Sequence, residues 1–254
     1  MPFALEGFLI ILSRITGLFL VAPIFSSRQM PGRVKALIIV LLAATLSYFV
    51  PIKYFVEPST PGLFLAAMVV EIFIGFTIGF VAYIVLGAIQ LAGQLMDMQM
   101  GFGIVNVVDP QSGTQIPLMG NFTQAIALLI YLAVDGHHYL LQAIVQSYKI
   151  IPVLGVRMDK GLYDLIFEIT VYLFVIAIKI AAPIVIAVVT TDIAMGFIAR
   201  TVPQMNVFIV GLPLKILVGL FMLFVLLPVY IWIFNILFFR FFAYIDQVLI
   251  LMGI

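Results

Sequence analysis

Long apolar stretches, separated by short polar breaks, make up almost the whole chain. A run of roughly 20 apolar residues lets a helix cross the hydrocarbon core of a bilayer, and such a helix satisfies its own backbone hydrogen bonds. The pattern therefore predicts an all-α, membrane-type protein with about six long hydrophobic helices. We expect these helices at about residues 5–25, 34–56, 62–96, 118–150, 163–200 and 207–250. Several exceed the length that a bilayer needs, which favours tilted or protruding helices within an assembly.

One segment, residues 97–117, interrupts this helical pattern. Met96, Met98 and Met100 precede a stretch that is punctuated by Gly and Pro and contains no Lys or Arg. Non-helical backbone at membrane depth is tolerated only where protein buries it or where it lines a water-filled cavity. We therefore expect either a surface loop whose methionines pack on a neighbouring helix, or a plug whose soft side chains close a pore. The residue spacing alone favours neither the surface loop nor the plug.

Composition narrows the class of protein. The chain is 65% hydrophobic and 9% charged, whereas soluble domains have about 25% charged residues. Its mean hydropathy of +1.30 exceeds what a soluble core accounts for. A net charge of +1 provides no basic surface that could follow a phosphate backbone, which argues against a nucleic-acid partner. The absence of cysteine excludes thiolate metal sites and cysteine nucleophiles.

The sequence offers little for catalysis. His137 and His138 are the two histidines of the chain. Adjacent residues on a helix point about 100° apart, and no further His or Cys completes a metal site, so a capping or interface role is favoured. Gly101-Phe102-Gly103 is a fragment of a dinucleotide fingerprint and follows a helix instead of a strand. With no other catalytic motif, we expect no enzyme, no cofactor and no bound metal.

Charged residues inside the apolar helices are candidates for structural or functional roles. These residues are Arg14, Glu71, Lys179, Asp192 and Lys215. An unpaired charge facing lipid is expensive, so such residues either pair within the fold or mark a transport pathway. Structural pairing is the favoured interpretation.

The last two helices predict two specific pairs. Their turn centres between residues 203 and 204, and residues equidistant from the turn of an antiparallel hairpin face each other. Asp192 then falls opposite Lys215, and Glu168 falls near Arg240.

Two helix faces combine a charge with small residues at i, i+4 spacing. The first carries Glu71, Gly75 and Gly79, and the second carries Gly211, Lys215 and Gly219. Small residues at this spacing let helix backbones approach closely. Both faces are therefore expected to be seams of helix packing.

Loop charges give a conflicting orientation. Arg28, Arg33 and Lys35 favour a cytoplasmic first loop, because Lys and Arg are in excess on that side. Counting spans would then make 97–117 cytoplasmic although it has no basic residue, while the opposite stretch, 135–162, has three. This conflict is expected if the chain does not cross the bilayer in a regular way.

Several runs of residues together resemble a known family. They are Met100-Gly-Phe-Gly-Ile-Val-Asn-Val-Val-Asp-Pro-Gln-Ser-Gly113, Asp135-Gly-His-His138, Ser147 followed by Ile151-Pro152, and Val202-Pro-Gln-Met-Asn-Val-Phe-Ile-Val-Gly-Leu-Pro-Leu-Lys215. Arg14-Ile-Thr-Gly17, Ala22-Pro23 and residues 28–35 fit as well. On these motifs, in this order over essentially the full length, the chain resembles the FliR family of flagellar export-gate proteins, whose injectisome relatives are called SctT.

The resemblance implies a subunit of the type III export gate in the bacterial inner membrane, at the flagellar basal body. It implies one copy of this chain with several copies of FliP and FliQ, wound into a closed pore that is raised from the bilayer. Residues 1–160 would be the FliP-like part and 161–254 a FliQ-like hairpin. Unfolded flagellar proteins would be the substrates. The energy for their export would come from a separate ATPase and the proton-motive force, acting through a partner such as FlhA or FlhB.

The resemblance also assigns the plug to the segment after Met100. The plug residues carried over are Met96, Met98, Met100, Gly101, Phe102, Gly103, Ile104, Val105, Asp109 and Pro110. Among them, we expect Phe102 with Met98 and Met100 to make the seal.

Two alternatives stay open. A small-solute transporter would use Arg14, Glu71 and Lys179 along a substrate route, with 97–117 as a broken-helix binding site. A pure scaffold would place Phe102 away from any pore.

Overall fold

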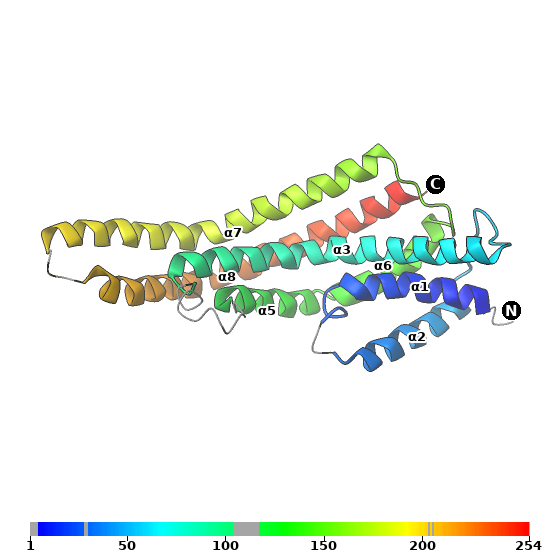
Figure 1. The fold of residues 1–254 in the computed structure, drawn as a ribbon, viewed down its shortest axis with the longest axis horizontal. Coiled ribbons are helices and arrows are strands. Elements are labelled where there is room, and N and C mark those ends of the chain that lie inside the picture. The colour runs from blue at the N-terminus through cyan, green and yellow to red at the C-terminus, as the bar shows by residue number, and fades with distance from the viewer. Residues whose placement is uncertain (1–4, 28–29, 104–116, 203, 205, 254) are drawn as a thin grey trace. The chain divides into compact units, whose positions relative to one another are not determined.

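The computed structural model describes residues 5–27, 30–103, 117–202, 204 and 206–253. Within these residues the chain forms helices and no strand, which confirms the all-α prediction (Figure 1). The helices are α1 (Leu5–Val21), α2 (Gly32–Phe49), α3 (Pro61–Met100), α5 (Leu118–Ala133), α6 (Gly136–Ile150), α7 (Lys160–Thr201) and α8 (Val207–Met252). Four of the predicted plug residues, Ile104, Val105, Asp109 and Pro110, lie outside the described residues.

Two expected helix boundaries are wrong. The expected helix over 118–150 is two helices, α5 and α6, bent by 62° at their junction. Asp135 begins the second helix in the left-handed region, with φ 55°, which breaks the helical path. The expected helix over 34–56 ends at Phe49, because Pro51 holds Val50 in an extended conformation.

The third helix is longer than expected. α3 continues to Met100 instead of ending at residue 96, so Met98 and Met100 also lie on the helix and not in the expected non-helical segment. Met and Gln lose little side-chain freedom in a helix, which explains the extension. Gly101 adopts φ 89°, a left-handed conformation that ends the helix.

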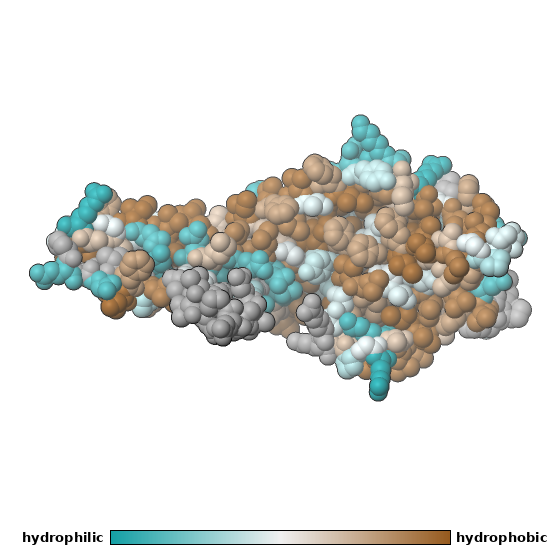
Figure 2. Space-filling model, in the orientation of Figure 1, coloured by the Kyte–Doolittle hydropathy of each residue, from teal (hydrophilic) through white to brown (hydrophobic). Residues whose placement is uncertain are grey.

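The helices have the length and apolar character of membrane spans. Among the described residues four helices pass this test, α2, α3, α7 and α8, and a fifth span is present if the bent pair α5 and α6 counts as one. Apolar residues cover much of the face drawn in Figure 2. Large side chains such as Phe208 in α8, which is 86% exposed, need lipid or another subunit to cover them.

The chain divides into two compact units. The first contains residues 1–85, 131–170 and 237–254, and the second contains residues 86–130 and 171–236. The division into 1–160 and 161–254 concerns likeness to other subunits and stays a prediction.

The hairpin of α7 and α8 keeps one register through the second unit. Lys215 Nζ lies 2.5 Å from Asp192 Oδ1, so the predicted ion pair is present. Further along the hairpin, the Tyr230 hydroxyl donates to the carbonyl oxygen of Ile180 at 3.0 Å. The two contacts connect residues that are nearly equidistant from the turn, as an antiparallel pair requires.

Candidate functional site

In the second unit, glycines bring the end of α3 against the start of α5. A Cβ on Gly93 would lie 2.4 Å from the Cα of Gly120, so α3 does not tolerate a larger side chain here. Thr123 Oγ1 donates back to the carbonyl oxygen of Met119 at 2.8 Å, within α5. The backbones of α3 and α5 are therefore in contact at Gly93, which lies about one helical turn before Asp97 in α3.

Asp97 uses this close approach to cap α5 from another helix. Its carboxylate accepts the backbone N–H of Met119 at 2.9 Å and that of Gly120 at 3.1 Å. The first N–H groups of a helix have no partner within it, and the helix dipole favours an anion there. Because Asp97 is only 6% exposed, these charge-assisted bonds are shielded from water.

Asp97 also contacts the other end of the segment between α3 and α5. Its backbone carbonyl accepts the N–H of Phe102 at 3.1 Å, just beyond the left-handed Gly101. We call Asp97, Phe102, Met119 and Gly120 the stem. Within the stem, Asp97 binds a residue on each side of the predicted plug segment: Phe102 before it, and Met119 and Gly120 after it.

The plug methionines have different surroundings. Met96 and Met100 are fully buried, whereas Met98 is 72% exposed. A Cβ on Gly219 of α8 would lie 2.6–2.7 Å from side-chain atoms of Met100, so Gly219 makes the space that Met100 occupies. We expected Gly219 to lie in a seam against another helix backbone, but its neighbour is the side chain of Met100.

Met98 lines an open apolar hollow of about 250 Å³. Leu95 and Gln99 of α3 flank it, and Ile178, Ala181, Ala182, Val185 and Ile186 of α7 form its other side. A flexible thioether beside an apolar hollow has room to change its conformation. Of the three methionines, Met98 is the one with exposed surface in this chain.

In the first unit, the predicted glycine seam of α3 is present and faces α1. A Cβ on Gly75 would lie 1.9 Å from the carbonyl oxygen of Arg14, and a Cβ on Gly79 would lie 3.0 Å from that of Leu18. Gly17 of α1 makes a similar approach to α3. The seam holds Arg14 directly against the face of α3 that carries Glu71.

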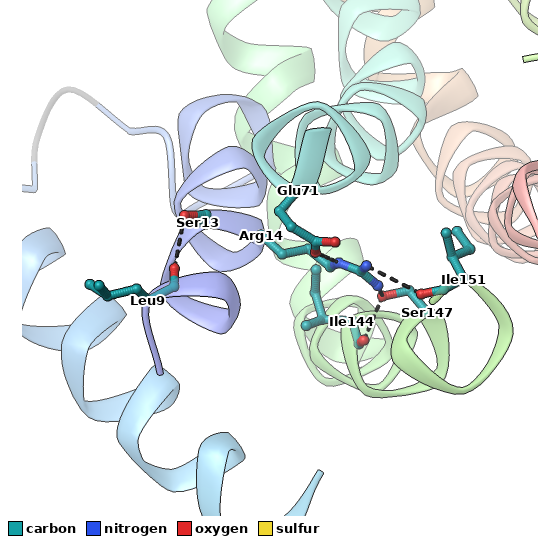
Figure 3. Close-up of polar contacts among 7 residues, drawn as sticks. All are labelled: Leu9, Ser13, Arg14, Glu71, Ile144, Ser147 and Ile151. Carbon is teal, nitrogen blue, oxygen red and sulfur yellow. Dashed lines mark hydrogen bonds and ion pairs between the residues drawn. The ribbon is translucent and has the colours of Figure 1, made fainter. Parts of the chain in front are cut away.

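Arg14 joins three helices through one guanidinium (Figure 3). Its Nε donates to Glu71 Oε2 at 2.5 Å, and its Nη1 donates to Ser147 Oγ at 2.7 Å. Its Nη2 lies 3.4 Å from the carbonyl oxygen of Ile151, at the end of α6, and its Cζ lies 3.8 Å from the centre of the Tyr148 ring. Arg14 and Glu71 have no exposed surface, so the pair connects α1, α3 and α6 as a buried structural contact.

The remaining predicted charges have less specific surroundings. Lys179 is exposed in α7 and makes no ion pair with any described residue. Glu168 and Arg240 are exposed residues of the first unit, and their pairing stays a prediction. The Asp192–Lys215 pair is partly exposed, and pairs of that kind contribute little to stability.

Sequence reasoning missed Asp97, the central residue of the stem. A signal was available, because α5 begins after Ile116-Pro117, which offers no capping side chain. A helix start without its own cap needs an acceptor from elsewhere. Asp97 is the acidic residue at the start of the 97–117 segment and shares a helix face with Gly93, four residues earlier.

Comparisons with known proteins agree on one family. Residues 5–241 match the family described as bacterial export proteins, family 1. The flagellar biosynthetic protein FliR of Bacillus subtilis (strain 168) is 38% identical over 226 residues, which cover 88% of this chain and 86% of the relative. The protein of that name from Escherichia coli (strain K12) is 28% identical over 217 residues, or 85% and 82% of the two chains. The one from Aquifex aeolicus (strain VF5) is 28% identical over 220 residues, or 85% and 83%.

Proposed function

Because this chain belongs to the family of bacterial export proteins, family 1, we propose that it is a structural and gating subunit of the flagellar type III export gate. Family membership supports a role in the flagellar export apparatus, and the long apolar helices support a membrane location. In the proposal, the chain forms with FliP and FliQ a closed pore in the inner membrane, at the basal body. Unfolded flagellar proteins pass through this pore.

The stem is the observation that carries the gating role. Asp97 holds the N-terminus of α5 and the backbone of Phe102, so both ends of the plug segment start from one rigid point. A plug anchored in this way is displaced by a passing polypeptide without separating α3 from α5. Met98 is exposed and Phe102 is half-buried, whereas Met96 and Met100 are fully buried, and in this proposal Met98 and Phe102 make the seal.

The chain acts as a passive conduit component. The buried pair of Arg14 and Glu71 serves helix contacts and not a chemical step. The driving force comes from partners such as FlhA and FlhB. Met side chains conform to polypeptides of varied sequence, which suits a pore that exports many substrates.

Co-purification and cross-linking test the assembly. A tagged chain is co-expressed with FliP and FliQ, and a cysteine is placed at Phe102 in this cysteine-free protein. We expect a stable complex in which the cysteine cross-links to an export substrate that is stalled in the pore. A cysteine at Phe208, an exposed residue of α8, is the control and should not cross-link to the substrate. A chain that is stable alone and does not bind FliP or FliQ would indicate a small-solute transporter instead.

Deletion tests the plug. Removal of residues 101–113 should leave assembly intact and make the membrane leaky to small ions, because the pore then lacks its seal. Ion conductance at the background level in an intact complex would overturn the plug role. It would favour a scaffold without a luminal element.

A further inference from the structure

The junction of α5 and α6 gathers three side chains that are able to bind a metal ion. Asp135, His137 and His138 each offer one ligand atom, and these atoms all lie within 4.8 Å of one another. The three residues belong to the first unit and lie apart in sequence from the stem. Neither the plug nor the helix packing accounts for this cluster.

Both sequence arguments against a metal site fail in the structure. The rings of His137 and His138 lie side by side, with centroids 4.1 Å apart, although the residues are adjacent on a helix. Asp135 supplies the third donor that the histidines lack. Its Oδ1 lies 3.3 Å from Nδ1 of His138, and two ligands of one tetrahedral Zn²⁺ ion, each bound at about 2.0–2.1 Å, lie about 3.3 Å apart.

The backbone directs Asp135 toward the histidines. Asp135 stands at the N-cap position of α6, yet its side chain makes no capping hydrogen bond. Its φ of 55° and ψ of 30° are left-handed values, which Asp tolerates better than most residues. The carboxylate is therefore available as a ligand instead of being used by the helix.

His137 is also free to bind. Its Nδ1 is buried and makes no hydrogen bond with any residue that the structure describes. Metal binding needs a neutral imidazole whose donor nitrogen is not engaged elsewhere. Two imidazoles and one carboxylate are a ligand set for Zn²⁺, Cu²⁺ or Ni²⁺, and not for Mg²⁺ or Ca²⁺, which prefer oxygen ligands.

We propose that Asp135, His137 and His138 form a site for one divalent transition-metal ion of the Zn²⁺ class, at the bend between α5 and α6. The three residues leave coordination positions open for water or for a donor from another subunit. A bound ion would tie Asp135, the N-cap residue that follows the end of α5, to the first turn of α6, and so fix the left-handed backbone at this junction. It would thereby hold the 62° bend between the two helices.

The chain is well suited to a direct test, because these are its two histidines and it has no cysteine. The full chain is purified in detergent through a tag without histidine, stripped with a chelator and titrated with Zn²⁺ alone. We expect one ion per chain. Cu²⁺ in the same protein should give an electron paramagnetic resonance spectrum with hyperfine coupling to two nitrogens.

Three variants locate the ligands. Loss of even an outer-shell partner weakens metal binding about tenfold or more, so His137→Gln, His138→Gln and Asp135→Asn should each weaken Zn²⁺ binding by at least about tenfold. Asn tolerates the left-handed conformation as Asp does, so Asp135→Asn removes the charge and keeps the backbone. Asp164→Asn, at an exposed carboxylate of α7, is the matched control and should bind as the unchanged chain does.

The proposal is overturned by either of two results. One is a Cu²⁺ spectrum of the unchanged chain with coupling to fewer than two nitrogens. The other is a His137→Gln/His138→Gln double variant that binds Zn²⁺ as tightly as the unchanged chain. Far-UV circular dichroism and gel filtration of every variant establish that weaker binding does not come from unfolding.

Discussion

The carboxylate of Asp97 lies 2.9 Å from the backbone nitrogen of Met119, so a residue of α3 caps the N-terminus of α5. An uncapped helix start inside protein leaves N–H groups without acceptors. Asp97→Ala should therefore cost about 1–3 kcal/mol of unfolding free energy, the penalty of leaving buried donors unpaired. Asp97→Asn should cost less, because the amide oxygen still accepts one N–H.

Unfolding of the detergent-solubilised chain measures both Asp97 variants. Gln99→Ala is the control, since Gln99 is exposed two residues further along α3. It should leave the unfolding free energy within about 0.5 kcal/mol of the unchanged chain. Equal losses for Asp97→Ala and Gln99→Ala would contradict the cap. In the assembled gate, Asp97→Ala should also raise ion leakage if the stem positions the plug.

The buried pair of Arg14 and Glu71 predicts a strongly non-additive result. Arg14→Leu leaves the Glu71 carboxylate buried without its cation and should cost about 3–5 kcal/mol. The double variant Arg14→Leu/Glu71→Leu removes both charges and should recover much of that loss. A double-mutant cycle on unfolding free energies measures the coupling.

Two further variants complete this cycle. Arg14→Lys should fail to restore stability, because one ammonium cannot reach Glu71, Ser147 and the Ile151 carbonyl together. Lys179→Leu, at an exposed cation in α7, is the matched control and should have little effect. If the losses at Arg14 and Glu71 simply add, the pair is not the structural contact described above.

Much of the fold could be predicted from the sequence because its contacts are local or follow from one turn. Asp192 and Lys215 are equidistant from the turn of a hairpin, so their pairing needed only the position of that turn. The bend at Asp135 was harder, because a left-handed φ at one residue leaves no mark on hydrophobic periodicity. The extension of α3 to Met100 was missed because Gly and Pro beyond it suggested an earlier end.

The candidate site was less accessible to sequence reasoning. Arg14 and Glu71 stood out as charges in apolar helices, but Ser147 lies 133 positions from Arg14, and nothing in the spacing connects them. Asp97 and Met119 are joined across a segment whose path the sequence does not fix. Spacing predicts neighbours within one helix or hairpin, whereas contacts between distant helices depend on where their backbones cross.

Substitution by Ala should have opposite effects at Gly75, in the contact between α1 and α3, and at Gly196, which lies outside it. A Cβ at Gly75 would lie 1.9 Å from the backbone oxygen of Arg14, so Gly75→Ala should force the helices apart and prevent stable folding or assembly. Gly196, inside α7, has nothing within 4 Å of its Cβ position. Gly196→Ala should be tolerated, with a gain of up to about 1 kcal/mol from helix propensity. Yield and gel-filtration profile of the two variants test this, and normal behaviour of Gly75→Ala would contradict the seam.

The effect of Gly219→Ala on stability should change sign with the residue at position 100. A Cβ at Gly219 would lie 2.6 Å from Met100 Cε, and Met100 is fully buried, so its side chain has no open space to enter. Gly219→Ala should therefore destabilise the unchanged chain by about 1–3 kcal/mol through overpacking. Met100→Ala should cost about 2–5 kcal/mol, because it leaves a cavity beside α8.

In the Met100→Ala background, however, the added methyl group at position 219 enters that cavity. Gly219→Ala should then be neutral or stabilise the chain by up to about 1 kcal/mol, the propensity advantage of Ala over Gly in a helix. Thermal unfolding of the four proteins measures both effects in one detergent. An equal cost for Gly219→Ala in both backgrounds would mean that Met100 does not occupy the space at Gly219. The stem alone would then hold the start of the plug segment.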